Sequence, residues 1–340
     1  MTNEDQIIYV PLSGGAGFAG QWRNAGTLEA DVYEGIFNID VAKLLKMDTK
    51  NFRWDITTTG QKIDQSISAL NVPAYSTGPG IENSDIFRME EGGAPGTIYG
   101  EVFATTVEEL TTQEDINITD YTVNELGYIV RVDELGTPDE RPVRLLDENG
   151  NPVLQAIGNT TPDFRLGFSN RFAYRGLQLY ALVDWKIGGD VYNLSKQQLY
   201  GHERHVDLSG NETSASFFSD GLYNEGVANI HFVEDGSFVM LREAALSYTF
   251  DKTQLAFLGG AVESIKLALI GRNLFTVTEY SGIHPDISSA TPGENVLSSR
   301  LNGGLGSNVY SPAGDPALFA VDGFGYPARR TFSFSLEATF

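Results

Sequence analysis

Cysteine is absent from the 340 residues of this chain. Its absence excludes a disulfide framework, a thiolate zinc site and a cysteine nucleophile. Long apolar runs are missing as well, because no stretch approaches the ~18 to 20 consecutive apolar residues that a membrane-spanning helix needs. An α-helical membrane protein is therefore excluded. A membrane-spanning β-barrel is not, since its strands alternate apolar and polar residues.

Basic residues are few, with 23 Lys and Arg against 45 Asp and Glu and a formal net charge of −22. Nucleic-acid binding depends on clustered cations, so this balance argues against a nucleic-acid partner. Met1 is followed by Thr-Asn-Glu-Asp, without the basic and apolar regions of a signal peptide. As written, the chain shows no export signal.

Alternation of apolar and polar residues is what the sequence does contain. In the last ten residues, Phe332, Phe334, Leu336, Ala338 and Phe340 fall on one face, and small polar residues and Glu337 fall on the other. Similar runs occupy 164–174, 177–187, 244–250 and, less cleanly, 265–277. The Arg175-Gly176 link between two of these runs predicts a tight hairpin.

These runs last ~10 to 13 residues, whereas strands of soluble proteins peak near ~5 to 6 and tilted membrane strands need ~9 to 11. We predict nine strands, at residues 26–40, 51–64, 84–91, 96–106, 162–174, 176–188, 238–250, 264–277 and 331–340. Their connectors alternate between short ones (41–50, 92–95, 175–176, 251–263) and long ones (65–83, 107–161, 189–237, 278–330). This alternation is typical of outer-membrane barrels, which have short periplasmic turns and long extracellular loops. The sequence therefore predicts an all-β fold that forms a portion of an antiparallel transmembrane β-barrel.

One motif imitates a dinucleotide-binding fingerprint. Gly15, Gly17 and Gly20 have the G-x-G-x-x-G spacing, and Asp40 follows at the distance of the ribose-binding acid. Residues 21–35 lack apolar residues at helical spacing, however, and no alternation of strands and helices follows. We therefore give this interpretation little weight.

Metal and catalytic motifs are equally weak. His202 and His205 have the spacing of a ligand pair, but histidines of a surface loop are the favoured interpretation. The run 147–151 resembles a calcium loop, yet Pro152 stands where such a loop needs glycine, which favours an Asn-Gly turn. No nucleophile elbow, zinc-protease motif or P-loop is present. We expect no enzymatic activity, no cofactor and no metal.

Aromatic residues in the long connectors are the remaining candidates for binding chemistry. Flat rings stack on sugars and on peptide side chains, although packing of the loops against one another is the more frequent role of a single such residue. The candidate substrate-binding residues are Tyr192, Tyr200, Phe218, Tyr223, Tyr280 and Tyr310.

Five segments, at 161–179, 185–193, 237–250, 271–286 and 324–340, together resemble the C-terminal half of SusC/RagA-type TonB-dependent outer-membrane receptors. Segments 24–26 and 87–100 are similar to upstream strands of the same barrel. The resemblance covers nearly the whole chain, in order. In that family the glycines and the Asn-Leu-Phe segment serve the barrel. Phe340 matches the terminal aromatic residue that marks outer-membrane barrels for insertion.

The resemblance implies import of oligosaccharides or oligopeptides across a Gram-negative outer membrane. The family's barrel of about 22 strands is filled by an N-terminal plug. A SusD-like surface lipoprotein closes over it, and TonB-ExbB-ExbD supplies energy. Residues 1–340 would be the C-terminal part of that barrel, in contact with outer-membrane lipid. The signal peptide, the plug and roughly the first thirteen strands would be absent.

Two other classes stay open. One is a soluble all-β carbohydrate-binding module, in which the alternating faces pack sheet on sheet. Strand length and the terminal Phe340 argue against it. The other is a glycosidase-associated β domain, which no motif supports. Dependence on detergent would separate the membrane protein from both.

Overall fold

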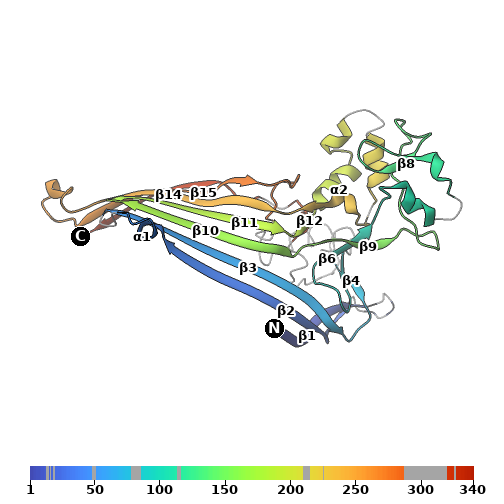
Figure 1. Cartoon of the computed structure of the whole chain (residues 1–340), viewed down its shortest axis with the longest axis horizontal. Helices are drawn as coiled ribbons and strands as arrows, with labels where there is room; N and C mark the ends of the chain where they lie inside the picture. The colour runs from blue at the N-terminus through green and yellow to red at the C-terminus, as the bar shows by residue number, and fades with distance from the viewer. Residues whose placement is uncertain are drawn as a thin grey trace.

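The computed structural model describes residues 1–12, 15, 17, 20–47, 51–77, 86–112, 116–209, 215–224, 226–286, 320–324 and 327–340. They form one long antiparallel sheet, here called the wall, with a globular region at one end, here called the cap (Figure 1). Within these residues, no helix has the length and apolar character needed to cross a membrane.

The wall has eight strands in the order β1-β2-β3-β10-β11-β14-β15-β16. Their bounds are β1 (Thr2–Pro11), β2 (Gly20–Asp40), β3 (Phe52–Leu70), β10 (Pro162–Tyr174), β11 (Leu177–Gly188), β14 (Phe238–Phe250), β15 (Ser264–Val277) and β16 (Thr331–Thr339). Every neighbouring pair is antiparallel. The predicted all-β, antiparallel class is confirmed. The sheet is open, with β1 and β16 as its edges.

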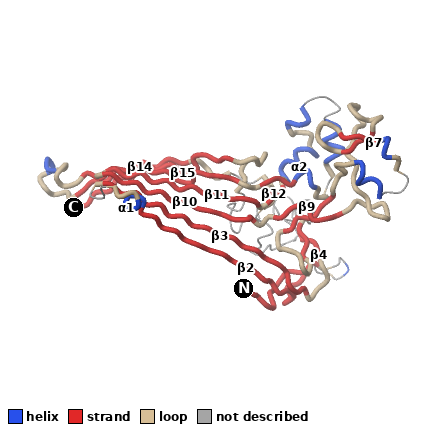
Figure 2. The backbone as a smooth tube through the Cα atoms, viewed as in Figure 1, coloured by secondary structure: helices blue, strands red, loops and turns tan. Residues whose placement is uncertain are grey.

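Connector lengths differ between the two ends of the wall. At one end lie the segment with α1 (Val41–Leu44), the Arg175-Gly176 link and the segment with η7 (Ala256–Leu258). At the other end, the long connections β3–β10, β11–β14 and β15–β16 leave the wall, and most of the helices gather there in the cap (Figure 2). The sorting of short and long connectors by end follows the predicted pattern, except that the short β1–β2 connection lies at the cap end.

The predicted hairpin at Arg175-Gly176 is confirmed. Tyr174 pairs with Leu177, so only two residues form the turn. Arg175 has a φ of 46°, in the left-handed region that two-residue hairpin turns use. A Cβ on Gly176 would lie 2.5 Å from the carbonyl oxygen of Thr249. Glycine is therefore needed where this turn meets the neighbouring strand.

Two of the nine predicted wall strands were wrong. The segments 84–91 and 96–106 contain β5 (Phe87–Met89) and β6 (Thr97–Glu101), which belong to a separate four-stranded sheet of the cap with β4 (Tyr75–Thr77) and β9 (Leu154–Asn159). Residues 84 and 85 lie outside the described residues. Phe87 and Ile98 are 1% and 0% exposed, so their apolar pattern belongs to a buried core. The predicted connectors 92–95 and 107–161 and the part of 65–83 after Leu70 accordingly belong to one excursion between β3 and β10.

A wall strand was also missed. β1 directly precedes the dinucleotide-like motif, and it pairs antiparallel with β2. Gly15 and Gly17 lie in the connection between these two strands, with a strand and not a helix after them. A dinucleotide-binding turn is therefore excluded. β2 and β3 are also longer than predicted, beginning at Gly20 and ending at Leu70 respectively.

The cap contains the remaining elements: η2 (Val107–Thr112), η3 (Ile118–Asp120), β7 (Tyr121–Val123), β8 (Ile129–Arg131), β12 (Asp190–Tyr192), α2 (Leu194–Gly201), η4 (Val206–Ser209), the π-helix η5 (Phe217–Leu222), η6 (Ile230–Phe232) and β13 (Val233–Asp235). Residues from all three long excursions share one buried cluster: Ile86, Phe87, Ile98, Phe103, Val130, Tyr192, Leu194, Tyr200, Phe217, Leu222, Ala228, Phe232 and Val321. The long excursions therefore pack into one folded unit with its own apolar core.

Candidate functional site

The two faces of the wall differ in character. One apolar row crosses six strands, because consecutive pairs in the register are Trp54–Phe172, Phe172–Leu179, Leu179–Leu246, Leu246–Leu269 and Leu269–Phe334. From Phe172 to Phe334 the exposed fractions of these side chains are 38%, 48%, 49%, 56% and 69%. A continuous exposed apolar surface marks contact with a membrane or with another protein.

The opposite face is polar. In the adjacent row Ser335 pairs with Ala268, Ala268 with Ser247, and Ser247 with Gln178. This face also carries ion pairs between neighbouring strands, such as Arg272 Nε to Glu243 Oε2 at 2.8 Å. The wall is therefore an amphipathic sheet, suited to separate a hydrocarbon phase from water.

Four charged residues form a cluster on the polar face where the wall meets the cap. Arg165 donates from Nε to Asp184 Oδ1 at 2.9 Å and from Nη2 to Asp184 Oδ2 at 2.6 Å. Arg242 donates to Asp184 Oδ2 at 2.9 and 2.8 Å and also contacts Asp286. Asp184 and Asp286 are 8% and 7% exposed. Asp286 follows β15, so this charged cluster fastens a cap excursion to three wall strands.

A cavity of about 260 Å³, here called the junction cavity, adjoins the charged cluster. Its walls come from β3, β10, β11, residues 160–162 and residues 285–286. Its charged lining residues are Arg165, Lys186 and Asp286. The volume is just under the about 300 Å³ at which small-molecule sites begin. One sugar ring or one amino-acid residue is the size of group that it accommodates.

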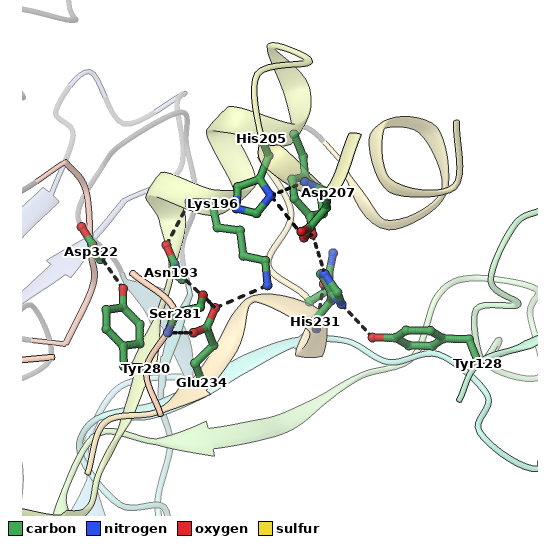
Figure 3. Close-up of polar contacts among 12 residues, drawn as sticks. Tyr128, Asn193, Lys196, His205, Asp207, His231, Glu234, Tyr280, Ser281 and Asp322 are labelled. Atoms are coloured by element: carbon green, nitrogen blue, oxygen red, sulfur yellow. Dashed lines mark hydrogen bonds and ion pairs between the residues drawn. The ribbon is translucent and has the colours of Figure 1, made fainter. Parts of the chain in front are cut away.

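Inside the cap, His231 contacts the hydroxyls of Tyr128, as Figure 3 shows, and of Tyr200. Its Nδ1 lies 2.8 Å from the hydroxyl of Tyr128, and its Nε2 lies 3.1 Å from that of Tyr200. The Tyr200 hydroxyl donates to Asp207 at 2.6 Å, so its oxygen accepts from Nε2–H, and Nδ1 accepts from Tyr128. Burial lowers the pKa of His231 to about 4 and raises the pKa of Tyr128 to about 12. The imidazole is neutral and fully hydrogen-bonded.

Glu234 forms a second polar junction (Figure 3). It accepts from Asn193 at 3.1 Å and from the backbone N–H and hydroxyl of Ser281 at 2.8 and 2.7 Å, and it lies 3.5 Å from Lys196 Nζ. Burial alone would raise the pKa of Glu234, but the hydrogen bonds from Ser281 and the charge of Lys196 outweigh it and lower the pKa. The junction ties the segment after β15 to α2 and β13.

Metal-ligating geometry does not occur among the described residues, where no group of three or more His, Asp and Glu side chains converges. His205 lies 3.1 Å from Asp207 through its Nδ1, as part of the polar network around Tyr200. These polar networks connect segments of the cap that are distant in sequence.

Most predicted substrate-binding residues lie inside the cap. Tyr192 and Tyr200 are 0% exposed and Tyr280 is 5% exposed, with its hydroxyl 2.7 Å from Asp322 Oδ2. Phe218 and Tyr223 are half-buried against the cap core. Tyr310 lies outside the described residues. The observed contacts of these rings are with the protein, and substrate contact stays a prediction.

Phe340 stands apart from these residues, at the turn end of the wall just after β16, and it is 84% exposed. Sequence reasoning missed the charged cluster and the junction cavity. The alternation in 164–174 and 177–187 places Arg165 and Asp184 on the polar sides of their strands, but Asp286 comes from a connector. Only the folded chain brings it to the wall.

No protein-family model matches the chain. TonB-dependent receptors P39 and P3 of Formosa agariphila are each 24% identical to it, over 85% and 99% of this chain and 30% and 31% of their own lengths. The RagAB peptide importer in its closed-closed state has a TM-score of 0.64 at 18% identity. In its open-open state the TM-score is 0.60 at 17% identity. Both structural matches cover 100% of this chain and 32% of the other, so the chain spans about a third of the length of its relatives.

Proposed function

Since this chain is similar to SusC/RagA-type TonB-dependent receptors in sequence and in fold, we propose that it forms a section of the barrel wall and of the extracellular loops of such a receptor. The receptor would import oligosaccharides or oligopeptides across a Gram-negative outer membrane. The observation that carries this proposal is the exposed apolar row from Phe172 to Phe334 on one face of the wall.

Lipid acyl chains would contact the apolar row and shield it from water. Burying one Leu or Phe side chain is worth about 1.5–3 kcal/mol, so leaving five of them exposed to water would be costly. A soluble module would cover them with a second sheet. Among the described residues this face stays open, as the exposure of Leu269 and Phe334 demonstrates. The polar face, with Ser335 and Gln178, would line an aqueous lumen.

The edges of the wall support a larger barrel. β1 and β16 each have one side without a neighbouring strand in the described sheet. Unpaired backbone groups are costly in hydrocarbon, so in a complete receptor these edges would pair with further strands. We therefore assign residues 1–340 to the C-terminal part of a barrel whose other strands, plug and TonB-contacting segment belong to a longer receptor.

Orientation follows from the connectors. The short turns would face the periplasm, and the cap would face the exterior, where it captures substrate. Phe340, at the turn end, would serve as the signal to the insertion machinery. The cap would meet a SusD-like surface lipoprotein, and TonB-ExbB-ExbD would supply energy through the plug. Buried Tyr192, Tyr200 and Tyr280 would act on substrate capture by setting the shape of the cap.

Flotation with lipid vesicles tests this proposal. The purified chain, diluted from denaturant into vesicles, should float with the lipid in a density gradient and should need detergent to remain in solution without lipid. Recovery of a monodisperse, folded chain from buffer without detergent or lipid would contradict the proposal. That outcome would favour a soluble β module.

A further inference from the structure

A groove of about 530 Å³, here called the sheet groove, lies on the four-stranded sheet of the cap and shares no lining residue with the junction cavity. Its floor comes from β4, β5, β6 and β9, which contribute Ser76, Arg88, Tyr99 and Leu154. Residues 226–228 form one side. Figure 1 shows β4 and β6 at the cap end of the wall. The volume falls within the range of about 300–1,000 Å³ that is typical of small-molecule sites.

Alternation along β5 and β6 separates the sheet groove from the cap core. Phe87 and Ile98 pair in the register and are 1% and 0% exposed, so they point into the core. Arg88 and Tyr99 follow them in sequence and therefore point to the other side of the sheet. There the guanidinium carbon of Arg88 lies 5.7 Å from the centre of the Tyr99 ring. Leu154 is 64% exposed, so this side of the sheet is open to solvent.

The charged groups that line the sheet groove balance one another. Among the described residues they are Arg88 and Glu90. Arg88 Nε donates to Glu90 Oε2 at 2.7 Å, and the Tyr99 hydroxyl donates to Glu90 Oε1 at 2.5 Å. The hydrogen bond from Tyr99 is the largest cause that lowers the pKa of Glu90, so this carboxylate is ionised at neutral pH. Glu101, the next acid along β6, accepts from Arg144 at 3.0 Å. The lining therefore carries no net charge.

Hydrogen-bonding capacity remains at the sheet groove after these contacts. Within the described part of the chain, the Arg88 side chain donates only through Nε, which leaves the N–H groups of its two terminal nitrogens for a ligand. Each Glu90 oxygen accepts one hydrogen bond and can accept another. Ser76 adds a hydroxyl, which both donates and accepts. The side of the groove is held in place, because the Ala228 carbonyl accepts from the Glu101 backbone N–H at 2.8 Å.

We propose that the sheet groove binds a neutral sugar residue of the substrate, which packs against the Tyr99 ring. Its hydroxyls accept from the terminal nitrogens of Arg88 and donate to Glu90. A sugar ring has an apolar C–H face and a rim of hydroxyls that donate and accept, so it matches an aromatic ring flanked by a donor and an acceptor.

Peptide side chains match this lining less well. A charged side chain of either sign would meet a like charge at Arg88 or Glu90. An apolar side chain would leave these polar groups without partners, which is costly in a desolvated site. The inference rests on the proposed function and narrows its substrate class to oligosaccharides with neutral residues.

Neutral trisaccharides test the proposal on the full chain in detergent micelles. The probes are linear trisaccharides of glucose, mannose, galactose and xylose, and acetyl-trialanine amide is the neutral peptide. Isothermal titration calorimetry should detect binding of at least one trisaccharide and no binding of the peptide. Failure of every trisaccharide to bind would overturn the proposal. Binding of the peptide as tightly as the best trisaccharide would overturn it too.

Substitutions at Tyr99 and Arg88 assign the binding to the sheet groove. Y99A should weaken binding of the best trisaccharide about tenfold, whereas Y99F keeps the ring and should retain most of the affinity. R88M removes the terminal donors and should also weaken binding about tenfold. Because the Arg88 side chain is 40% exposed, R88M leaves the cap core intact. The matched control Y33A removes a ring that is 63% exposed on β2 and should leave the affinity unchanged. Unchanged affinity in both Y99A and R88M would contradict the assignment.

Vesicle flotation separates this inference from the function on which it rests. If the chain floats with lipid but binds none of the trisaccharides, the sugar site is wrong and the membrane role stands. If a trisaccharide binds through Tyr99 and the chain remains soluble without lipid, the sugar site stands and the membrane role fails.

Discussion

Arg165 and Asp184 form a two-point contact across adjacent strands, with nitrogen–oxygen distances of 2.9 and 2.6 Å. They are diagonal neighbours, because Arg165 pairs with Lys186 in the register and Asp184 pairs with Gly167. Arg242, on the next strand β14, donates to the same carboxylate, so the single side chain of Asp184 joins three strands of the wall.

Substitution D184N should strongly destabilise the wall. It removes the charge that both Arg165 and Arg242 bind, and leaves two half-buried guanidinium groups short of a counter-ion. Loss of one partner of a buried ion pair costs about 3–5 kcal/mol. Urea unfolding in detergent micelles measures this loss. In the control D64N, which removes an exposed ion pair with Lys62, the free energy of unfolding should change little. Equal effects of the two substitutions on the free energy of unfolding would contradict this account.

Acidification should loosen the cap through His231. Burial holds the folded-state pKa of His231 near about 4, below its ordinary 6.5, so the unfolded chain takes up the proton first as pH falls. The stabilisation is complete above about pH 6.5 and is lost progressively toward about pH 4, by up to about 3 kcal/mol.

Hydrogen–deuterium exchange in residues 190–235, compared between pH 7.5 and pH 4.5, measures this loss. In H231Q, which keeps hydrogen-bonding groups but does not titrate, the increase in exchange on acidification should be smaller. An equal increase in both proteins would assign the pH dependence to other groups, such as Glu234.

Substitution Y200F should destabilise the cap without opening a cavity. The lost hydroxyl accepts from His231 and donates to Asp207, so both would lose a partner. An unsatisfied buried polar group costs about 1–3 kcal/mol. The temperature at which the cap unfolds, monitored by hydrogen exchange, should therefore be lower in Y200F than in the original protein. Y33F, at a side chain that is 63% exposed, should cause no shift, and an unaffected Y200F protein would refute the network's role.

Lysine should have opposite consequences on the two faces of β16. F334K places a charge in the apolar row, where the cost is about 2–4 kcal/mol at the middle of a bilayer. S335K places the same charge on the polar face one residue away. The urea midpoint in lipid vesicles should fall for F334K and stay close to that of the original protein for S335K. A similar decrease for both would argue against a lipid-facing row.

The wall was largely predictable from the sequence because alternation with a period of two reports directly on a sheet that is apolar on one side. Seven predicted strands lie in the wall, and residues 162–174 and 238–250 match β10 and β14 at both ends. The same pattern gave a wrong location for the strands of Phe87 and Ile98. A strand that packs on a buried protein core and a strand that faces lipid both place apolar residues on one side.

The junction cavity and the cap networks were not predictable. Asp286 lies far in sequence from Asp184, and a charged residue in a connector gives no periodic signal that would place it against a wall strand. Tyr200 and Tyr280 were identified as aromatic residues of the connectors, but the sequence does not report whether the connectors fold onto themselves. Their burial depends on contacts with distant segments: the Tyr200 ring packs against the Phe232 ring, and the Tyr280 hydroxyl donates to Asp322. Only the tertiary fold brings these residues together.

The central claim, that the wall separates lipid from water, is tested most directly by spin labels on neighbouring residues. Since the chain contains no cysteine, L269C and A268C each provide one attachment site, on the apolar and the polar face respectively. In lipid vesicles, the label at 269 should be accessible mainly to oxygen, and the label at 268 mainly to a water-soluble nickel chelate. Equal access of the nickel chelate to both labels would contradict the account.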